Sequence, residues 1–191
     1  MFVGLLAALS AAAAAGMRIA LPLLAIGLLQ IDTLWDNVPL LSRIHPQVLV
    51  AILTSWSLFE LFGSKKLLSL RALQLVELSF SPLVGALLAV TAVRIAQHQL
   101  ELELEPLWLI GIVGGLLALV LKLVEVGWFF RLQRLPLWAI FAEDILCMFL
   151  VIFAFKAPQQ GGLIAMLLLW LAVRSSQEWY RWYHQSANSK Q

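Results

Sequence analysis

The chain has 191 residues, of which 62% are hydrophobic and only 13% are charged, and its formal net charge is +2. Soluble globular domains carry about 25% charged residues, so this composition excludes an ordinary soluble domain and predicts a polytopic membrane protein. The small net charge offers no argument for a nucleic-acid partner, and the single cysteine, Cys147, excludes an internal disulfide.

Six apolar runs follow one another along the chain, at residues 2–29, 48–62, 70–93, 107–130, 137–157 and 163–173. A helix needs about 20 residues to cross the hydrocarbon core, and runs without period-2 alternation exclude a membrane barrel. We therefore predict an all-α fold with about six transmembrane helices. They form a single domain over residues 1–175, followed by a cytoplasmic interfacial tail over residues 176–191. A cleaved secretory signal is a weaker alternative for the first run, because no positive charge precedes it.

The first and third runs are interrupted. The first would measure about 42 Å as one helix, against a hydrocarbon core of about 30 Å, so it must tilt, bend or break. Gly16 and Pro22 flank Arg18 within it and predict the bend. The third run contains "SFSPLVG", with Ser79, Ser81 and Pro82. We predict that both spans are broken or kinked and act as hinges, as at transporter sites. The alternative is a plain proline kink with the serines bonded back to the helix backbone.

Lysine and arginine are distributed unequally between the two sides of such a six-span chain. The side with fewer carries Arg43, Arg94 and Lys156. The richer side carries Lys65, Lys66, Arg71, Arg131, Arg134, Arg174, Arg181 and Lys190. An excess of positive charge in short loops is typical of the cytoplasmic face, so both termini are expected there.

Several charged residues fall inside the apolar runs, most of them at a similar predicted depth. They are Arg18, Glu60, Glu77, Lys122, Glu125, Glu143 and Asp144. A charge in hydrocarbon costs ~2.5–3.5 kcal/mol on insertion scales, so these groups should face inward and pair. We expect Lys122 to meet Glu125, Glu143 or Asp144, and Arg18 to meet Glu77 or Asp144. The cluster is either a static polar lock between helices or a site for a proton or small cation.

The chain resembles a bacterial integral-membrane family known as domain of unknown function 4126. The segments that carry the resemblance are "AAAGMRIALPLLAIGLL", "FELFGSKK", "PLVGALLAV", "GGLLALVLKLVEVGWFFR" and "AEDILCMFLVIFAF", in that order. By this resemblance, the family motif positions are Arg18, Pro22, Glu60, Lys65, Lys122, Glu143 and Asp144. Ser64 stands where the family motif has an aspartate. The resemblance implies no established activity, and it places the chain in a bacterial inner (plasma) membrane or a thylakoid membrane.

The sequence shows no residue pattern typical of a metal site or of a catalytic site. The histidines, His45, His98 and His184, all lie in predicted loops or the tail, so no metal site or cofactor is expected. No nucleophile–base pair is apparent, which makes an enzyme less expected than a non-enzyme.

Two functions stay open. One is a small transporter or channel-like protein for protons, cations or a small solute, in which Glu143 and Asp144 bind the charge. The other is a membrane module that assembles or stabilises a larger complex. The expected partners are the lipid bilayer and, as a homo-oligomer or within a membrane complex, other subunits.

Overall fold

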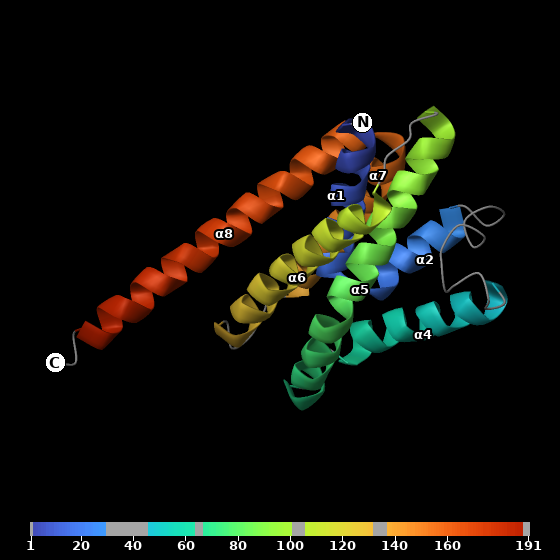
Figure 1. The fold of residues 1–191 in the computed structure, drawn as a ribbon. Coiled ribbons are helices and arrows are strands. Elements are labelled where there is room, and N and C mark those ends of the chain that lie inside the picture. The colour runs from blue at the N-terminus through green and yellow to red at the C-terminus, as the bar shows by residue number, and fades with distance from the viewer. Residues whose placement is uncertain (1, 30–45, 64–66, 101–105, 132–136, 189–191) are drawn as a thin grey trace.

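The computed structural model describes residues 2–29, 46–63, 67–100, 106–131 and 137–188, and all of its regular structure is helical. The helices, in chain order (Figure 1), are α1 (Phe2–Met17), α2 (Ala20–Leu29), α4 (Pro46–Gly63), α5 (Leu67–Leu100), α6 (Leu107–Arg131), α7 (Leu137–Lys156) and α8 (Pro158–Asn188). The predicted all-α class is therefore confirmed.

Helix α1 is the centre of the bundle, and it packs against α5, α6, α7 and α8. Its sequence is almost entirely alanine and glycine in the second half, and Ala12, Ala13, Ala14 and Ala15 are all fully buried. Small side chains let helix backbones approach closely and gain dispersion contacts without large knobs. Because its side chains are small along "SAAAAAG", helix α1 can be surrounded closely by four other helices.

Helices α5 and α6 approach each other through glycines. A Cβ atom added to Gly114 would lie 2.4 Å from the Cβ of Ala89 and 3.0 Å from the carbonyl oxygen of Gly85. A Cβ added to Gly85 would lie 2.4 Å from the Cβ of Ala118. These positions therefore need glycine, because alanine side chains and backbone oxygens of the facing helix already occupy the space.

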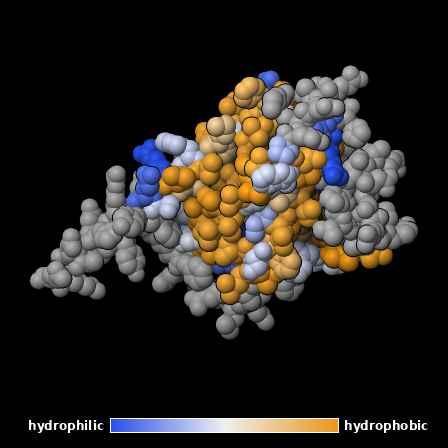
Figure 2. Space-filling view, in the orientation of Figure 1, coloured by the Kyte–Doolittle hydropathy of each residue, from blue (hydrophilic) through white to orange (hydrophobic). Residues whose placement is uncertain are grey.

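Large apolar side chains, in contrast, lie on the outside of the bundle, and the face shown in Figure 2 is mostly apolar. Exposed examples from α5 to α8 are Leu83, Leu116, Phe149, Leu163 and Trp170. Soluble monomers rarely expose continuous apolar surface of this kind, whereas small residues inside and large ones outside suit a bundle in lipid. The distribution of side-chain size thus favours association with a membrane.

Two stretches within the described helices are long and apolar enough to cross a bilayer, Gln74–Gln97 in α5 and Leu107–Trp128 in α6. The six predicted spans are not supported. The first run divides into α1 and α2, whose 16 and 10 residues are each shorter than the roughly 20 residues that a crossing requires. The apolar runs in α4 and α8 are short as well, because polar residues interrupt them early.

The break predicted near Gly16 and Pro22 is present, since α1 ends at Met17 and α2 begins at Ala20. Pro22 lies in the first turn of α2, where backbone N–H groups have no intrahelical acceptor, so its missing donor costs nothing there. The third run is not broken, because α5 continues as one helix through Pro82. Ser79 Oγ donates to the carbonyl oxygen of Leu75 at 2.9 Å, the backbone bond of the alternative interpretation.

Helix α8 continues well past the bundle (Figure 1), and residues 176–188 extend it without interruption. The division of the chain into a domain over residues 1–175 and an interfacial tail stays a prediction.

Candidate functional site

The site begins at the carboxyl end of α1, where the helix stops inside the bundle. The last carbonyl groups of a helix lack intrahelical donors and carry partial negative charge. Lys122 Nζ of α6 donates to the carbonyl oxygen of Met17 at 3.0 Å, and Cys147 Sγ of α7 donates to that of Ala14 at 3.4 Å. Arg18, the first residue after α1, adds a second cation at this end. The break therefore puts two positive side chains where the helix terminus favours them.

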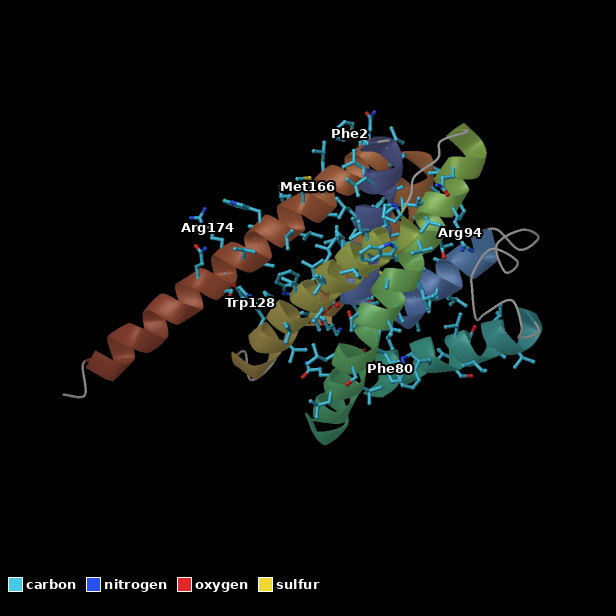
Figure 3. All side chains as sticks on the ribbon, in the orientation of Figure 1. Phe2, Phe80, Arg94, Trp128, Met166 and Arg174 are labelled. Carbon is cyan, nitrogen blue, oxygen red and sulfur yellow. The ribbon has the colours of Figure 1, made fainter. Side chains whose placement is uncertain are left out.

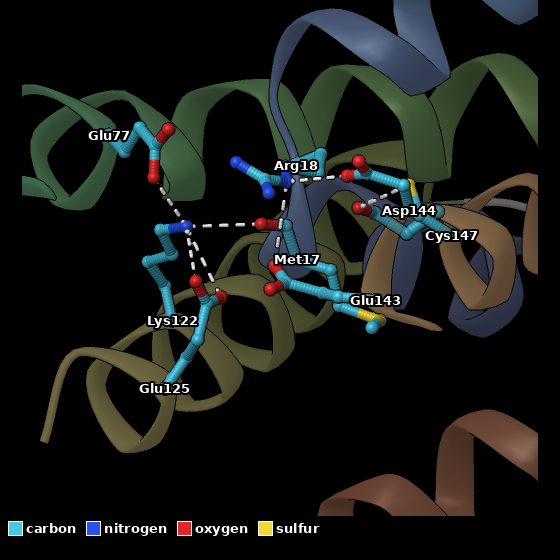
Figure 4. A network of polar contacts seen from close by, with 9 residues as sticks. Met17, Arg18, Glu77, Lys122, Glu125, Glu143, Asp144 and Cys147 are labelled. Carbon is cyan, nitrogen blue, oxygen red and sulfur yellow. Dashed lines mark hydrogen bonds and ion pairs between the residues drawn. The ribbon is translucent and has the colours of Figure 1, made fainter. Parts of the chain in front are cut away.

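Lys122 forms one branch of the network in Figure 4. Its Nζ atom lies 2.5 Å from Glu77 Oε2 on α5 and donates to Glu125 Oε1 and Oε2, on its own helix, at 3.0 and 3.2 Å. The Lys122 side chain is fully buried and that of Glu77 is 3% exposed. Because α5 and α6 run in opposite directions, the start of one and the end of the other meet at one level. Lys122 thus joins α1, α5 and α6.

Arg18 forms the second branch, toward α7 (Figure 4). Its Nε atom donates to Asp144 Oδ1 at 2.8 Å and lies 3.6 Å from Glu143 Oε1. The three side chains are between 11% and 18% exposed. Adjacent residues on a helix point about 100° apart, yet both carboxyl groups lie near the same Nε atom, which donates to Asp144 and has Glu143 as a second, more distant partner. Arg18 thus joins the break after α1 to α7.

The structure brings six of the seven predicted cluster residues into one connected group, and Glu60 lies outside the described side chains. Of the predicted pairs, Lys122 with Glu125 and Arg18 with Asp144 are present. Pairing of Lys122 with Glu77 was missed, because depth along a helix does not reveal the direction in which its side chains point.

The predicted hinge residues occupy different surroundings in the structure. Gly16 packs against Ala118, where an added Cβ would lie 2.9 Å from backbone atoms. Pro22 starts α2, as described above. Ser81 is fully buried on α5 and lies one turn from Glu77. Whether any of these positions moves stays a prediction.

Carboxylates outnumber cations in this group by four to two. Oε1 of Glu77 and Oε1 of Glu143 are buried and accept no hydrogen bond. Ser81 Oγ and Gln74 Nε2, both on α5, are also buried and have no hydrogen-bond partner. An unsatisfied buried polar group costs ~1–3 kcal/mol. The site therefore has polar capacity in excess of what its own side chains use.

Gln74 was not selected from the sequence. Gln74, Glu77 and Ser81 are spaced by three and four residues, so they form one buried polar stripe on α5. That spacing, within an apolar run, was the signal that could have identified it.

A cavity of about 500 Å³ lies between α6 and α8 and reaches the cluster. Glu125 and Glu143 supply its acidic groups, while Arg174 and Ser175 of α8 also line it. Trp128 of α6, labelled in Figure 3, also lines the cavity, and its Nε1 donates to Ser175 Oγ of α8 at 2.9 Å. The remaining lining is apolar: Met17, Leu121, Val124, Leu168, Leu171 and Ala172. Among the described residues, no group of histidine, cysteine and acidic side chains is arranged to hold a metal ion.

The comparison with known families agrees with the resemblance noted above. The family described as Domain of unknown function (DUF4126) matches residues 5–178, and the chain belongs to this family. The chain has no match among curated proteins or among solved structures.

Proposed function

We propose that this DUF4126 member is a multi-pass membrane protein that binds a proton or small cation at its charge cluster and moves it across a bilayer. The observation that carries the proposal is a buried group with two more carboxylates than cations, two of whose acids line a cavity. Intramembrane ionisable groups that face a cavity are typical of ion and proton pathways. The chain would cross the membrane at least at α5 and α6, within a bacterial inner or thylakoid membrane and with cytoplasmic termini.

The roles of the acids follow from their contacts. Asp144 is held by Arg18 at 2.8 Å and serves to position it. Glu143 keeps one oxygen without a hydrogen bond, and Glu125 lines the same cavity, so these two are the cation-binding groups. Lys122 and Arg18 offset part of the negative charge and prevent the acids from repelling one another. The role predicted for Glu143 therefore stays in the proposal, whereas that of Asp144 becomes structural.

The tight packing beyond the cluster argues for a transporter rather than an open channel. Toward the amino end of α1, the alanines of α1 and the glycines of α5 and α6 are packed without exposed surface. A cation could reach the acids from the cavity but could not continue past α1 in this arrangement. Transport would then require α1 to move relative to α2, and the break at Arg18 and Ile19 is the joint where that could occur.

Flux into proteoliposomes tests the proposal. Purified protein is reconstituted, a potassium diffusion potential is applied, and internal pH or sodium is followed with a dye. Glu143→Gln should abolish flux while the protein stays folded, because the amide cannot carry the negative charge. Lys156→Gln, at the exposed end of α7, is the matched control and should retain it. Absence of flux in the unaltered protein for every tested ion would contradict the proposal.

A static assembly module is the second candidate, and the ion pairs themselves favour it. They connect the end of α1 with α5, α6 and α7, as expected of a lock that sets helix positions. In that case Glu143→Gln should lower protein abundance or the yield of a co-purified complex, and the unaltered protein should show no ion flux. Partner capture from native membranes in mild detergent distinguishes the two functions.

A further inference from the structure

The cavity between α6 and α8 has a chemical character that is more specific than a proton site requires. Most of its lining is apolar, and its polar groups are of both signs, with Glu125 and Glu143 on one part and Arg174 with Ser175 on another. A volume of about 500 Å³ falls within the usual range of ~300–1,000 Å³ for sites that hold organic ligands. A bare inorganic cation would leave the apolar walls unused.

The charges define what kind of ligand would fit. Two carboxylates favour a cation with several hydrogen-bond donors, and a primary ammonium has three. Arg174 has the opposite preference, since its guanidinium matches a phosphate or carboxylate. Its guanidinium carbon lies 5.3 Å from the ring centroid of Trp170, which supports the side chain on the exposed face of α8. A ligand that satisfies both ends therefore carries an ammonium and an anionic group together.

The surroundings of the cavity indicate where such a ligand would come from. Leu171 of α8 lines the cavity and is close to half exposed, so the apolar wall continues to the surface of the bundle. In lipid, this surface faces acyl chains rather than water. A molecule with a zwitterionic head and an apolar tail could enter sideways between the two helices without crossing water.

We infer that the cavity binds an amine-bearing phospholipid, with its ammonium at Glu125 and Glu143 and its phosphate toward Arg174. The inference rests on the proposed cation site and names its ligand class. Oε1 of Glu143, which accepts no hydrogen bond within the protein, would accept one from the ammonium group. Trimethylation of the nitrogen would remove all three donors while keeping charge, phosphate and chain, so it makes a matched comparison ligand.

Native mass spectrometry of the full-length protein in a neutral detergent measures this binding. The probes are lysophosphatidylethanolamine, lysophosphatidylcholine with the same chain, and dodecylamine. Hydrogen bonds to charged groups imply that the ethanolamine lipid binds about tenfold or more tightly than the choline lipid. Glu143→Gln should remove that preference, whereas Lys156→Gln should keep it. Equal affinity of the unaltered protein for the two lysophospholipids would overturn the inference.

Two further variants cover the case in which Glu143→Gln fails to fold. Leu171→Trp fills the cavity without changing charge and should weaken binding of the ethanolamine lipid by about tenfold or more, in line with the energy of a buried hydrophobic side chain. Arg174→Gln should weaken binding of the lipid but not of dodecylamine. Binding of dodecylamine alone, with none of the ethanolamine lipid, would overturn the phospholipid assignment and indicate a free amine.

Failure of the inference and failure of the proposed function give different results. Glu143-dependent proton or sodium flux without any preference for the ethanolamine lipid would remove the inference and keep the proposed transport. A clear preference for the ethanolamine lipid without ion flux would remove the proposed transport and keep the inference that the cavity binds an amine-bearing phospholipid.

Discussion

Replacement of Lys122 by methionine is the most direct test of the charge cluster. Methionine has a similar length and shape, so the change removes the charge and leaves little space. The lysine is fully buried, 2.5 Å from Glu77 and 3.0 Å from Glu125, and it also donates to the carbonyl oxygen of Met17. Lys122→Met therefore leaves two carboxylates without their nearest cation and one helix-terminal carbonyl without its donor.

The expected cost follows from these contacts. Removing one partner of a buried ion pair destabilises a protein by ~3–5 kcal/mol, because the other charge stays buried and uncompensated. The lost hydrogen bond to the Met17 carbonyl adds ~0.5–1.5 kcal/mol. Whole-domain stabilities are about 5–15 kcal/mol, so Lys122→Met should lower the free energy of unfolding by a large part of its value.

A triple variant separates charge from packing. When Lys122→Met is combined with Glu77→Gln and Glu125→Gln, no charge of the Lys122 branch remains, and most of the stability should return, since replacing a complete buried ion pair is often close to neutral. Unfolding in detergent micelles, followed by circular dichroism during a denaturant titration, measures the stability of the single and of the triple variant. Lys156→Met is the control, and as an exposed substitution it should change stability by about 0.5 kcal/mol or less. If Lys122→Met behaved like this control, the cluster would not be energetically coupled and the reasoning above would be refuted.

Further expectations concern packing and the second branch of the cluster. Gly114→Ala should destabilise the fold by ~1–3 kcal/mol, because its Cβ would overlap Ala89. The Cβ of Gly111→Ala would lie 3.4 Å from its nearest neighbour, so this change should be neutral or stabilising by a few tenths of a kcal/mol. Thermal melts measure the stability of both variants. Ser10→Ala removes a 2.7 Å bond from α1 to the carbonyl oxygen of Leu150 and should cost ~0.5–1.5 kcal/mol, while removal of the exposed hydroxyl of Ser79 should cost less. Arg18→Lys keeps the charge but loses the Nε–H group that faces Asp144 and Glu143, so we expect lower flux in proteoliposomes and about 1–3 kcal/mol lower stability. Unchanged flux and stability would show that a point charge is sufficient.

Local features of the chain were predictable because they depend on residues close in sequence. Gly16 and Pro22, which flank Arg18, predicted a break within the first run, and α1 ends at Met17. The partner of Arg18 could be limited to two acids, Glu77 and Asp144, because the cost of a buried charge requires a carboxylate that reaches it from an adjacent helix. Asp144 is that partner.

The number of membrane spans and the continuity of the third run could not be predicted from the sequence alone. Six spans are not supported within the described residues. Each apolar run was counted as a single crossing, whereas the break after Met17 divides the first run into helices too short to cross alone. Pro82 was expected to interrupt the third run, but α5 passes through it, since tertiary packing holds the helix together on both sides.

Composition and hydrophobic pattern by themselves determined that the chain is helical, that its surface is apolar and that its buried charges must pair, because each of these follows from the free energy of placing a residue in lipid or in a helix. Only the tertiary structure decided which acid meets Lys122, that α1 is the central helix, and that a cavity between α6 and α8 reaches Glu125 and Glu143. The physical reason is rotation: a helix of given sequence can turn about its own axis at little local cost, and only the packing of its neighbours selects the face that each side chain presents.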